Sequence, residues 1–308
     1  MKHITSILDI KKDDILDIFD IANDYSNLIL KNGNILGGKI MGSFFLQPST
    51  RTQLSFQSSF LRLGGKWIGF SDIETTRLGG TYHESFADTA KIVTEYCDVI
   101  VLRSQNEMVL NAFKKDVSVP VISAGCGRWE HPTQGLLDLF TIFNLLGRLN
   151  DINILISGNP DNRCVNSFLA GLTRWENINI HFVVPERLRF SGNHERVSPE
   201  FAAVHYYENY EEFFETPHVK GIDVIYIDDL NAEGESIARS YEIYPNLIFS
   251  KEKLKRFNKD VILLHPLPRT NIAAEINNLS NAKYFEQAKN GLYIRTALFY
   301  WLFAQKSF

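Results

Sequence analysis

Short apolar segments alternate with helical segments along almost the whole chain, and this alternation limits the folds that the chain can adopt. In the first half, the candidate strands cover residues 39–46, 66–70, 98–102 and 119–123. In the second half, they cover residues 153–156, 178–184, 223–227 and 261–264. Strands that alternate with helices form parallel βαβ units. The sequence therefore predicts an α/β fold with mainly parallel sheets that are flanked by helices.

The length and the apolar content of the chain fit two domains. Its 308 residues are 44% hydrophobic, which is enough for two cores of ordinary size. From residue 131 to residue 146 the chain is apolar almost all round, which predicts a buried helix between two domains. We expect a first domain over residues 1–130 and a second over residues 131–287, joined by interdomain helices.

Charge and cysteine content narrow the functional class. A formal net charge of -4, with 22% charged residues, argues against a nucleic-acid-binding protein. Cys97, Cys126 and Cys164 are odd in number and widely spaced, so neither a disulfide framework nor a clustered zinc site is predicted. The N-terminus lacks a signal-peptide core, and no apolar run reaches the length of a membrane span. We expect a cytoplasmic protein that acts on small molecules, without a membrane partner.

The segment 44–56 joins a strand, a polar corner and a helix. Pro48 disfavours a helical conformation at the residue before it, so the helix can begin only near Ser49. Ser49 and Thr50 suit the N-cap position. A helix that begins here directs backbone N–H groups and the positive end of its dipole beyond the strand, with Arg51 beside them. The corner is a candidate phosphate site, and an ordinary capped helix with a solvated arginine fits these residues alone equally well.

Three short motifs follow one another along the chain: Ser49-Thr50-Arg51-Thr52, His131-Pro132-Thr133-Gln134 and His265-Pro266-Leu267-Pro268-Arg269. In this order they resemble the signatures of the aspartate/ornithine carbamoyltransferase family, and the third has the form of the aspartate branch. The resemblance covers nearly the whole chain. It implies transfer of the carbamoyl group of carbamoyl phosphate to an amine, aspartate by motif, which yields N-carbamoyl-L-aspartate in pyrimidine biosynthesis.

The resemblance also has consequences for assembly and cofactors. It implies a homotrimer with sites at subunit boundaries, and a C-terminal helix within residues 288–308 that packs back on the first domain. The reaction needs no cofactor and no metal. The residues neither require nor exclude a regulatory chain.

Carbamoyl transfer requires groups that bind the phosphate, hydrogen-bond donors that polarise the carbonyl group, and an uncharged amine. By resemblance, the phosphate and the carbonyl oxygen are bound by Ser49, Thr50, Arg51, Thr52, Arg103 and His131. Among these, the residues expected to act on the carbonyl group are Arg51, Thr52, Arg103 and His131. The carbamoyl NH₂ is expected to meet Gln134 and the backbone carbonyls of Pro266 and Leu267. The chemistry is consistent, because guanidinium and imidazole N–H groups donate whereas amide and main-chain oxygens accept.

The residues expected at the acceptor depart from the family pattern. Arg163 and Arg295 match family positions and could hold one carboxylate. After the strand at 223–227, aspartate enzymes present an Arg and, two residues on, a Gln, whereas this chain has Asp228-Asp229-Leu230-Asn231. At about 4 Å and an effective dielectric near 20, changing attraction into repulsion weakens the binding of a carboxylate by several kcal/mol.

A second departure lies in the loop that follows the strand at 66–70. In aspartate enzymes this loop carries a lysine that reaches the site of a neighbouring subunit, whereas residues 71–85 contain no lysine. Arg77, Tyr82 and His83 are the candidate substitutes, although a guanidinium and an ammonium are not interchangeable in a tight site. In addition, Gln47 stands where the family has an acidic residue.

Three functions therefore stay open on the sequence. The first is a carbamoyltransferase of the aspartate type. The second is a carbamoyltransferase with another acceptor, whose amine or guanidine group Asp228 and Asp229 would receive. The third is a catalytically impaired paralogue that binds carbamoyl phosphate or holds a partner subunit, because the loop lysine is absent. The retained donor residues favour a carbamoyltransferase.

Overall fold

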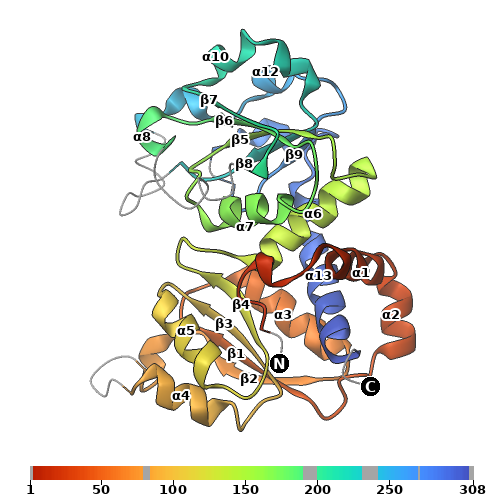
Figure 1. Ribbon diagram of the computed structural model, residues 1–308, viewed down its shortest axis with the longest axis vertical. Helices are drawn as coiled ribbons and strands as arrows, with labels where there is room; N and C mark the ends of the chain where they lie inside the picture. Colours follow the sequence, from red (N-terminus) through yellow and green to blue (C-terminus); the bar gives the residue numbers. More distant parts are fainter. Residues whose placement is uncertain (1–2, 79–83, 190–199, 231–241, 270, 305–308) are drawn as a thin grey trace. The chain divides into compact units, whose positions relative to one another are not determined.

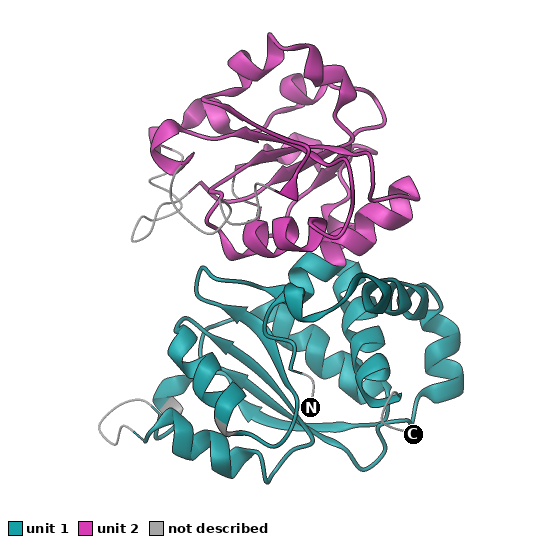
Figure 2. Ribbon diagram, viewed as in Figure 1, with its two compact units in different colours: residues 1–136, 289–308 teal, residues 137–288 magenta. Residues whose placement is uncertain are grey.

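The computed structural model describes residues 3–78, 84–189, 200–230, 242–269 and 271–304. It divides into two compact units, one made of residues 1–136 and 289–308 and the other of residues 137–288 (Figure 2). The division thus falls after residue 136, whereas the sequence places the boundary after residue 130. Both units are parallel sheets flanked by helices, which confirms the predicted fold class (Figure 1).

The first unit contains a four-stranded sheet in the order β2-β1-β3-β4. Its strands are β1 (Ile40–Phe45), β2 (Lys66–Phe70), β3 (Val99–Ser104) and β4 (Val121–Cys126). Its helices before the last segment are α1 (Lys12–Asn23), α2 (Tyr25–Asn32), α3 (Thr50–Arg62), α4 (Phe86–Val93) and α5 (Glu107–Asp116). All four predicted strands are present, and β4 begins and ends later than the apolar run at 119–123 indicates.

Side-chain alternation along the strands gives this sheet two buried faces. Phe44 and Leu102 pack with Phe113 on the face that α4 and α5 cover. On the other face, Phe56 and Phe60 of α3 meet Phe299 with ring centroids 5.8 and 4.9 Å apart. Figure 1 shows α3 and the C-terminal helix on that side of the sheet. The C-terminal helix therefore packs on the first unit.

The second unit contains a five-stranded sheet in the order β7-β6-β5-β8-β9. Its strands are β5 (Asn153–Ser157), β6 (Asn179–Val183), β7 (Ala203–Tyr207), β8 (Val224–Ile227) and β9 (Ile262–Leu264). Its helices include α7 (Arg163–Leu172), α8 (Glu186–Arg189), α10 (Tyr210–Phe214) and α12 (Lys251–Leu254). Strand β7 is absent from the sequence-based assignment, because four of its five residues are only partly buried at the sheet edge and no apolar run marks them.

Two long helices cross the division between the units. These are α6 (Pro132–Leu146), which begins one residue after the start of the predicted range 131–146, and α13 (Tyr284–Ala304), which begins before the predicted range 288–308. Short 3₁₀ turns connect the other elements: η1 (Ile7–Asp9), η2 (Ile73–Thr75), η4 (Pro217–Gly221), η5 (Pro245–Leu247) and η6 (Ala274–Ile276). Within the described part of the chain, no helix combines the length and the apolar character that crossing a membrane requires.

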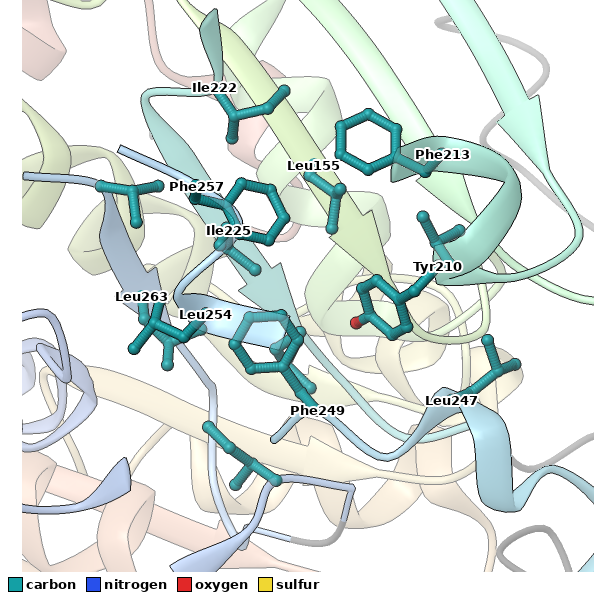
Figure 3. Close-up of a cluster of buried hydrophobic side chains, with 14 of the residues drawn as sticks. Leu155, Tyr210, Phe213, Ile222, Ile225, Leu247, Phe249, Leu254, Phe257 and Leu263 are labelled. Carbon is teal, nitrogen blue, oxygen red and sulfur yellow. The ribbon is translucent and has the colours of Figure 1, made fainter. Parts of the chain in front are cut away.

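The core of the second unit lies between its sheet and the short helices α10 and α12. Leu155 and Ile225 of the sheet pack against Phe213, Phe249 and Phe257, as Figure 3 shows. The opposite face is covered by α7, where Phe168 stacks on Tyr226 at 4.7 Å between ring centroids. Successive residues of β8 therefore point to opposite faces, and the residues that follow β8 lie at the carboxyl edge of the sheet.

Candidate active site

Both sheets have a topological switch point, where the chain turns from one side of the sheet to the other. In the first unit it lies between β1 and β3, and in the second it lies between β5 and β8. Ligands of open parallel sheets bind beyond the carboxyl ends of the strands at this point. The first motif follows β1, Arg103 lies near the end of β3, and Asp228 follows β8. The topology thus brings most of the predicted residues to the two ligand-binding edges.

Ser49 precedes helix α3, but its side chain does not cap the helix. Ser49 has the extended backbone of an N-cap residue, yet its side chain makes no capping hydrogen bond. The Ser or Asn residues that precede α4, α5 and α7 do accept such bonds from the first turn. Thr50 and Arg51 are exposed, and Thr52 is buried at 7% exposure. The first turn of α3 therefore presents backbone N–H groups and polar side chains to an anion.

A β-bulge in β4 fixes the side chain of Arg103 at the carboxyl edge of the sheet. Leu102 pairs with Ser123 and Ser104 pairs with Cys126, so β4 contains one extra residue opposite Arg103. The Arg103 side chain is 7% exposed, and its Nη1 donates to the carbonyl oxygen of Ala124 at 3.0 Å. This bulge fixes the guanidinium next to the carboxyl end of β1, because Arg103 also pairs with Phe45.

His131 and Thr52 meet although 79 positions separate them. The Nε2 atom of His131 lies 3.3 Å from Oγ1 of Thr52, and both residues are buried. The segment before His131 is fixed by Glu130, whose carboxylate accepts from the backbone N–H of Ile7 at 2.9 Å. Gln134 is 8% exposed in the first turn of α6, and its N–H donates to the carbonyl of His131 at 2.8 Å. The second motif thus lies against the first.

Gly125 is a site residue that the sequence analysis did not select. Its φ is +109°, and a Cβ atom built on it would lie 3.1 Å from Nη1 of Arg103 and 3.3 Å from Cδ2 of His131. Only glycine allows both this backbone conformation and this close approach. A glycine within a strand is the available signal for a bulge, and Ala124-Gly125 follows an apolar run here.

Arg295 belongs to this same unit in the structure. Its guanidinium donates to Oγ of Ser55 at 2.8 Å and to Oγ1 of Thr133 at 3.2 Å, and it lies 5.0 Å from the ring centroid of Phe56. The residue is 3% exposed. Arg295 therefore ties α13 to α3 and to the start of α6. Its predicted role at the acceptor stays a prediction.

The third motif forms a polar turn in the second unit. The backbone N–H of Leu267 donates to Nδ1 of His265 at 2.9 Å, and the N–H of His265 donates to Oε1 of Gln287 at 2.9 Å. Leu267 has a φ of +61°, which is uncommon for a branched residue. Pro266 and Leu267 are half-buried. The turn that would present their carbonyls is thus fixed by His265.

Asp228, Asp229 and Arg163, which are predicted to bind the acceptor, lie near the switch point of the second unit. Asp228 is 3% exposed, and its backbone N–H donates to the carbonyl of Ser157 at 2.9 Å. The N–H of Asn159 donates to the carbonyl of Asp229 at 2.7 Å, and Arg163 begins α7 a few residues later. Burial raises the pKa of the Asp228 carboxyl well above its usual range, and the nearby Asp229 adds to this effect. Asn231 lies outside the described residues.

The loop after β2 is described only in part. Arg77 is exposed, and its carbonyl accepts from the N–H of Glu84 at 2.8 Å. Tyr82 and His83 lie outside the described residues. Among the residues that the structure describes, no group of three or more His, Cys, Asp or Glu side chains could hold a metal ion.

Two family models match the chain in sequence order. The model for the aspartate/ornithine carbamoyltransferase carbamoyl-P binding domain matches residues 2–144. The model for the aspartate/ornithine carbamoyltransferase Asp/Orn binding domain matches residues 150–302.

Curated relatives and solved structures agree with these models. The aspartate carbamoyltransferase catalytic subunit of Clostridium kluyveri is 34% identical over 302 residues, which are 96% of each chain. That of Thermoplasma volcanium is 34% identical over 97% of each chain. The catalytic subunit of M. jannaschii aspartate transcarbamoylase has a TM-score of 0.85 at 32% identity, covering 100% of this chain and 99% of its own. Trypanosoma cruzi aspartate transcarbamoylase in complex with carbamoyl phosphate and aspartate has a TM-score of 0.86 at 27% identity, covering 97% of this chain and 94% of its own.

These similarities extend over both units, and they agree with the three motifs and with the buried cluster of Thr52, Arg103 and His131. The chain therefore belongs to the aspartate/ornithine carbamoyltransferase family.

Proposed function

We propose that the chain transfers the carbamoyl group of carbamoyl phosphate to the amino group of aspartate, which yields N-carbamoyl-L-aspartate for pyrimidine synthesis. The observation that carries the proposal is the cluster of Arg103, Thr52 and His131 beside the uncapped first turn of α3. The curated relatives are named aspartate carbamoyltransferase catalytic subunits, which supports aspartate as the acceptor. The three cysteines are free thiols, which fits a reducing cytoplasm.

In the proposed reaction the phosphate binds at the start of α3. The N–H groups of the first turn, together with Ser49, Thr50 and Arg51, neutralise part of its charge. Arg103 adds a second guanidinium at the end of the adjacent strand. Because these groups are fixed by the sheet before substrate binds, they need little reorganisation during the reaction.

In this proposal the carbonyl group of carbamoyl phosphate accepts hydrogen bonds from buried side chains. As the amine nitrogen attacks the carbamoyl carbon, the carbonyl oxygen gains negative charge, which Arg103, Thr52 and His131 stabilise. The bond between the carbamoyl carbon and the phosphate oxygen breaks, and the leaving phosphate takes up the proton that the nitrogen loses. Gln134 and the carbonyls of Pro266 and Leu267 accept hydrogen bonds from the carbamoyl NH₂. This assignment of roles is part of the proposal.

A second acceptor class is favoured by one observation. Two carboxylates, Asp228 and Asp229, stand at the switch point of the second unit, where aspartate enzymes have an arginine. An ionised pair there would attract an acceptor with a cationic group. Aspartate stays the first candidate because of the named relatives.

An assay with labelled carbamoyl phosphate and a panel of amines tests the proposal. The panel contains aspartate, its amide asparagine as a control without the second carboxylate, and diamines as cationic acceptors. Formation of N-carbamoylaspartate at a rate well above that with asparagine supports the aspartate activity. Product from diamines alone supports the cationic acceptor, and carbamoyl phosphate binding without any product supports an impaired paralogue.

We also propose a homotrimer, which is the assembly that the family resemblance implies, and an exposed apolar surface of the first unit supports association. Leu54 and Leu61 of α3 are 60% and 52% exposed, and Trp67 of the edge strand β2 is 38% exposed. These three side chains line one groove together with Gln57, Ser58 and Arg62. Exposed apolar patches on an unpaired sheet edge favour association. Arg77 follows this strand and is a candidate to reach a neighbouring site.

Native mass spectrometry tests the assembly. Leu61→Glu and Trp67→Glu are expected to shift the trimer to the monomer, because they place a charge in the apolar groove. Leu30→Glu is the matched control, since Leu30 is 83% exposed on α2 and does not line the groove. A wild-type monomer, or a trimer that survives both groove substitutions, contradicts the proposal.

A further inference from the structure

The side chain of Asp228 lies at the switch point of the second unit, on the face of the sheet that α7 covers. It follows Tyr226 by two positions, and alternate residues of a strand point to the same face. Tyr226 stacks on Phe168 of α7, which fixes this direction. Figure 1 shows β5 and β8 side by side, and Asp228 follows the end of β8. This is the edge at which ligands of parallel sheets bind.

Three hydrogen bonds fix Asp228 in place. Its N–H donates to Ser157 of β5 at 2.9 Å, and its carbonyl accepts from Nδ2 of Asn271 at 2.6 Å. Its carboxyl Oδ1 accepts from the N–H of Asp229 at 2.8 Å. An added Cβ at Gly158 would lie 3.0 Å from the Cβ of Asp228, so the loop after β5 packs closely against it. The carboxyl group has little freedom to turn away.

The second carboxyl oxygen has no such support. Oδ2 of Asp228 is buried and finds no hydrogen-bond partner among the described residues. Leaving a buried polar atom unsatisfied is unfavourable, and more so if the atom is charged. An unsatisfied buried atom in a native structure needs an explanation, and a functional role is one such explanation at a ligand-binding edge.

The surroundings of this carboxyl group favour its neutral form. Burial is the largest cause that raises the pKa of Asp228 above its usual value, and the neighbouring Asp229 and Asp138 raise it further. Both carboxylate oxygens of Asp138 accept hydrogen bonds, one from Tyr226 at 2.9 Å and one from Gln287 at 2.6 Å. These bonds fix Asp138 on the face of the sheet to which Tyr226 points. The N–H of Asp229 and the Arg163 guanidinium lower this pKa, but burial and the charge of Asp229 have larger effects. A proton on Oδ2 is therefore available for donation.

We propose that Asp228 acts as a neutral hydrogen-bond donor for a carboxylate of the acceptor. The group bound is thus an amino-acid carboxylate, and the inference rests on the proposed transfer to aspartate. A carboxylic acid and a carboxylate form a strong, charge-assisted hydrogen bond. The Asp228 side chain can then bind an acceptor that has two carboxylates, because the side chain itself carries no charge. An ionised Asp228 would instead repel that acceptor.

Steady-state kinetics with aspartate test the inference through two variants. Asp228→Ala removes the donor and is expected to raise the KM for aspartate roughly 10- to 100-fold. Asp228→Asn keeps a donor of similar size and is expected to raise this KM only about two- to fivefold, because an amide donates less strongly than a carboxylic acid. Asp260→Asn is the matched control, since Asp260 is exposed. An Asn variant that loses as much as the Ala variant overturns the inference.

Calorimetric titration with succinate separates this inference from the proposed function. Succinate carries both carboxylates and lacks the amine, so its binding does not depend on turnover. In the pH range where succinate is doubly ionised, the Kd of the wild-type protein is expected to stay constant while Asp228 is protonated and to rise up to tenfold per pH unit once Asp228 ionises, whereas the Asn variant shows no such rise. Binding that tightens with rising pH, or no succinate binding by the folded wild-type protein, overturns the inference. Absence of N-carbamoylaspartate in the amine assay overturns the proposed function instead.

Discussion

The two units have the same kind of topology and carry opposite chemistry at corresponding places. In the first unit the switch point between β1 and β3 presents a helix N-terminus and buried Arg103. In the second unit the switch point between β5 and β8 presents the buried carboxyl group of Asp228. A parallel sheet thus fixes where a ligand binds, and the side chains at its edge determine which charge it accepts.

The two units also differ in the hydrogen bonding of their buried polar side chains. Arg103 is secured by the Ala124 carbonyl within a β-bulge, and His131 is in reach of Thr52. The carboxylate of Asp138 is secured by Tyr226 and Gln287, whereas Oδ2 of Asp228 is left without a described partner. We therefore expect the first unit to be preorganised for its ligand, and the second to be more sensitive to pH.

The largest expected effect is at Arg103. Arg103→Ala is expected to lower the turnover of carbamoyl phosphate by about 10²–10³, since it removes a positioned donor for the developing oxyanion. Arg103→Lys is expected to recover little, because an ammonium cannot reproduce the planar guanidinium. Turnover at saturating aspartate, with circular dichroism to confirm folding, is the measurement. The control is Arg256→Ala, whose guanidinium lies over Phe214 in the other unit. A loss below tenfold at Arg103 contradicts the assignment.

A smaller loss is expected from Gly125→Ala. The new Cβ would approach Arg103 Nη1 to 3.1 Å at a φ of +109°, so both the bulge and the donor must shift. Displacement of catalytic groups by a fraction of an ångström to 1 Å costs up to about 10²-fold, and we expect on the order of tenfold in kcat. The matched control is Gly221→Ala, because a Cβ at Gly221 meets nothing within 4 Å. Equal kcat values for the two variants would show that Gly125 is not a site residue.

Removal of one hydroxyl tests the polar network of the second unit. Tyr226→Phe deletes the donor to Oδ2 of the buried Asp138 and is expected to lower the free energy of unfolding by roughly 1–3 kcal/mol. Chemical denaturation of the variant and of the wild-type protein measures this difference. Tyr96→Phe serves as the control, since Tyr96 is 57% exposed and should change stability little. A Tyr226 variant as stable as the control would show that Asp138 gains no net stabilisation from this bond.

A further expected effect is a pH dependence of stability in the second unit. Burial, followed by the neighbouring His205 and His218, lowers the pKa of His181 from 6.5 to about 4. The folded protein then binds fewer protons here than the unfolded chain between these pH values. The free energy of unfolding should therefore fall as the pH is lowered from about 6.5 to about 4, and be fully retained above this range.

Thermal melts between pH 4 and pH 7 measure this dependence on the wild-type protein and on His181→Gln. The glutamine variant is expected to melt lower at pH 7 and to show a flatter pH dependence. If the variant keeps the wild-type slope, groups other than His181 are responsible for it.

Much of the fold could be predicted because strongly apolar strands and their connecting helices leave a local pattern. The strands at Ile40–Phe45 and Lys66–Phe70, and the helix at Pro132–Leu146, were found in this way. Strand β7 was missed, since an edge strand buries too little to need an apolar run. The β4 strand was assigned too early, because Gly125 interrupts the pattern where the bulge forms.

The sequence by itself determined the fold class, the position of the helix that begins after Ser49, and the set of candidate residues for the donor site. It could do so because strand and helix periods, Pro48, and the order of the three motifs are local properties. Only the tertiary structure decided that Arg295 is bound to Ser55 and Thr133, that Gly125 makes room for Arg103, and that Asp228 is buried with one oxygen lacking a partner among the described residues. These properties depend on contacts between segments that are distant in the chain, and burial and the resulting cost of charge exist only once those segments pack.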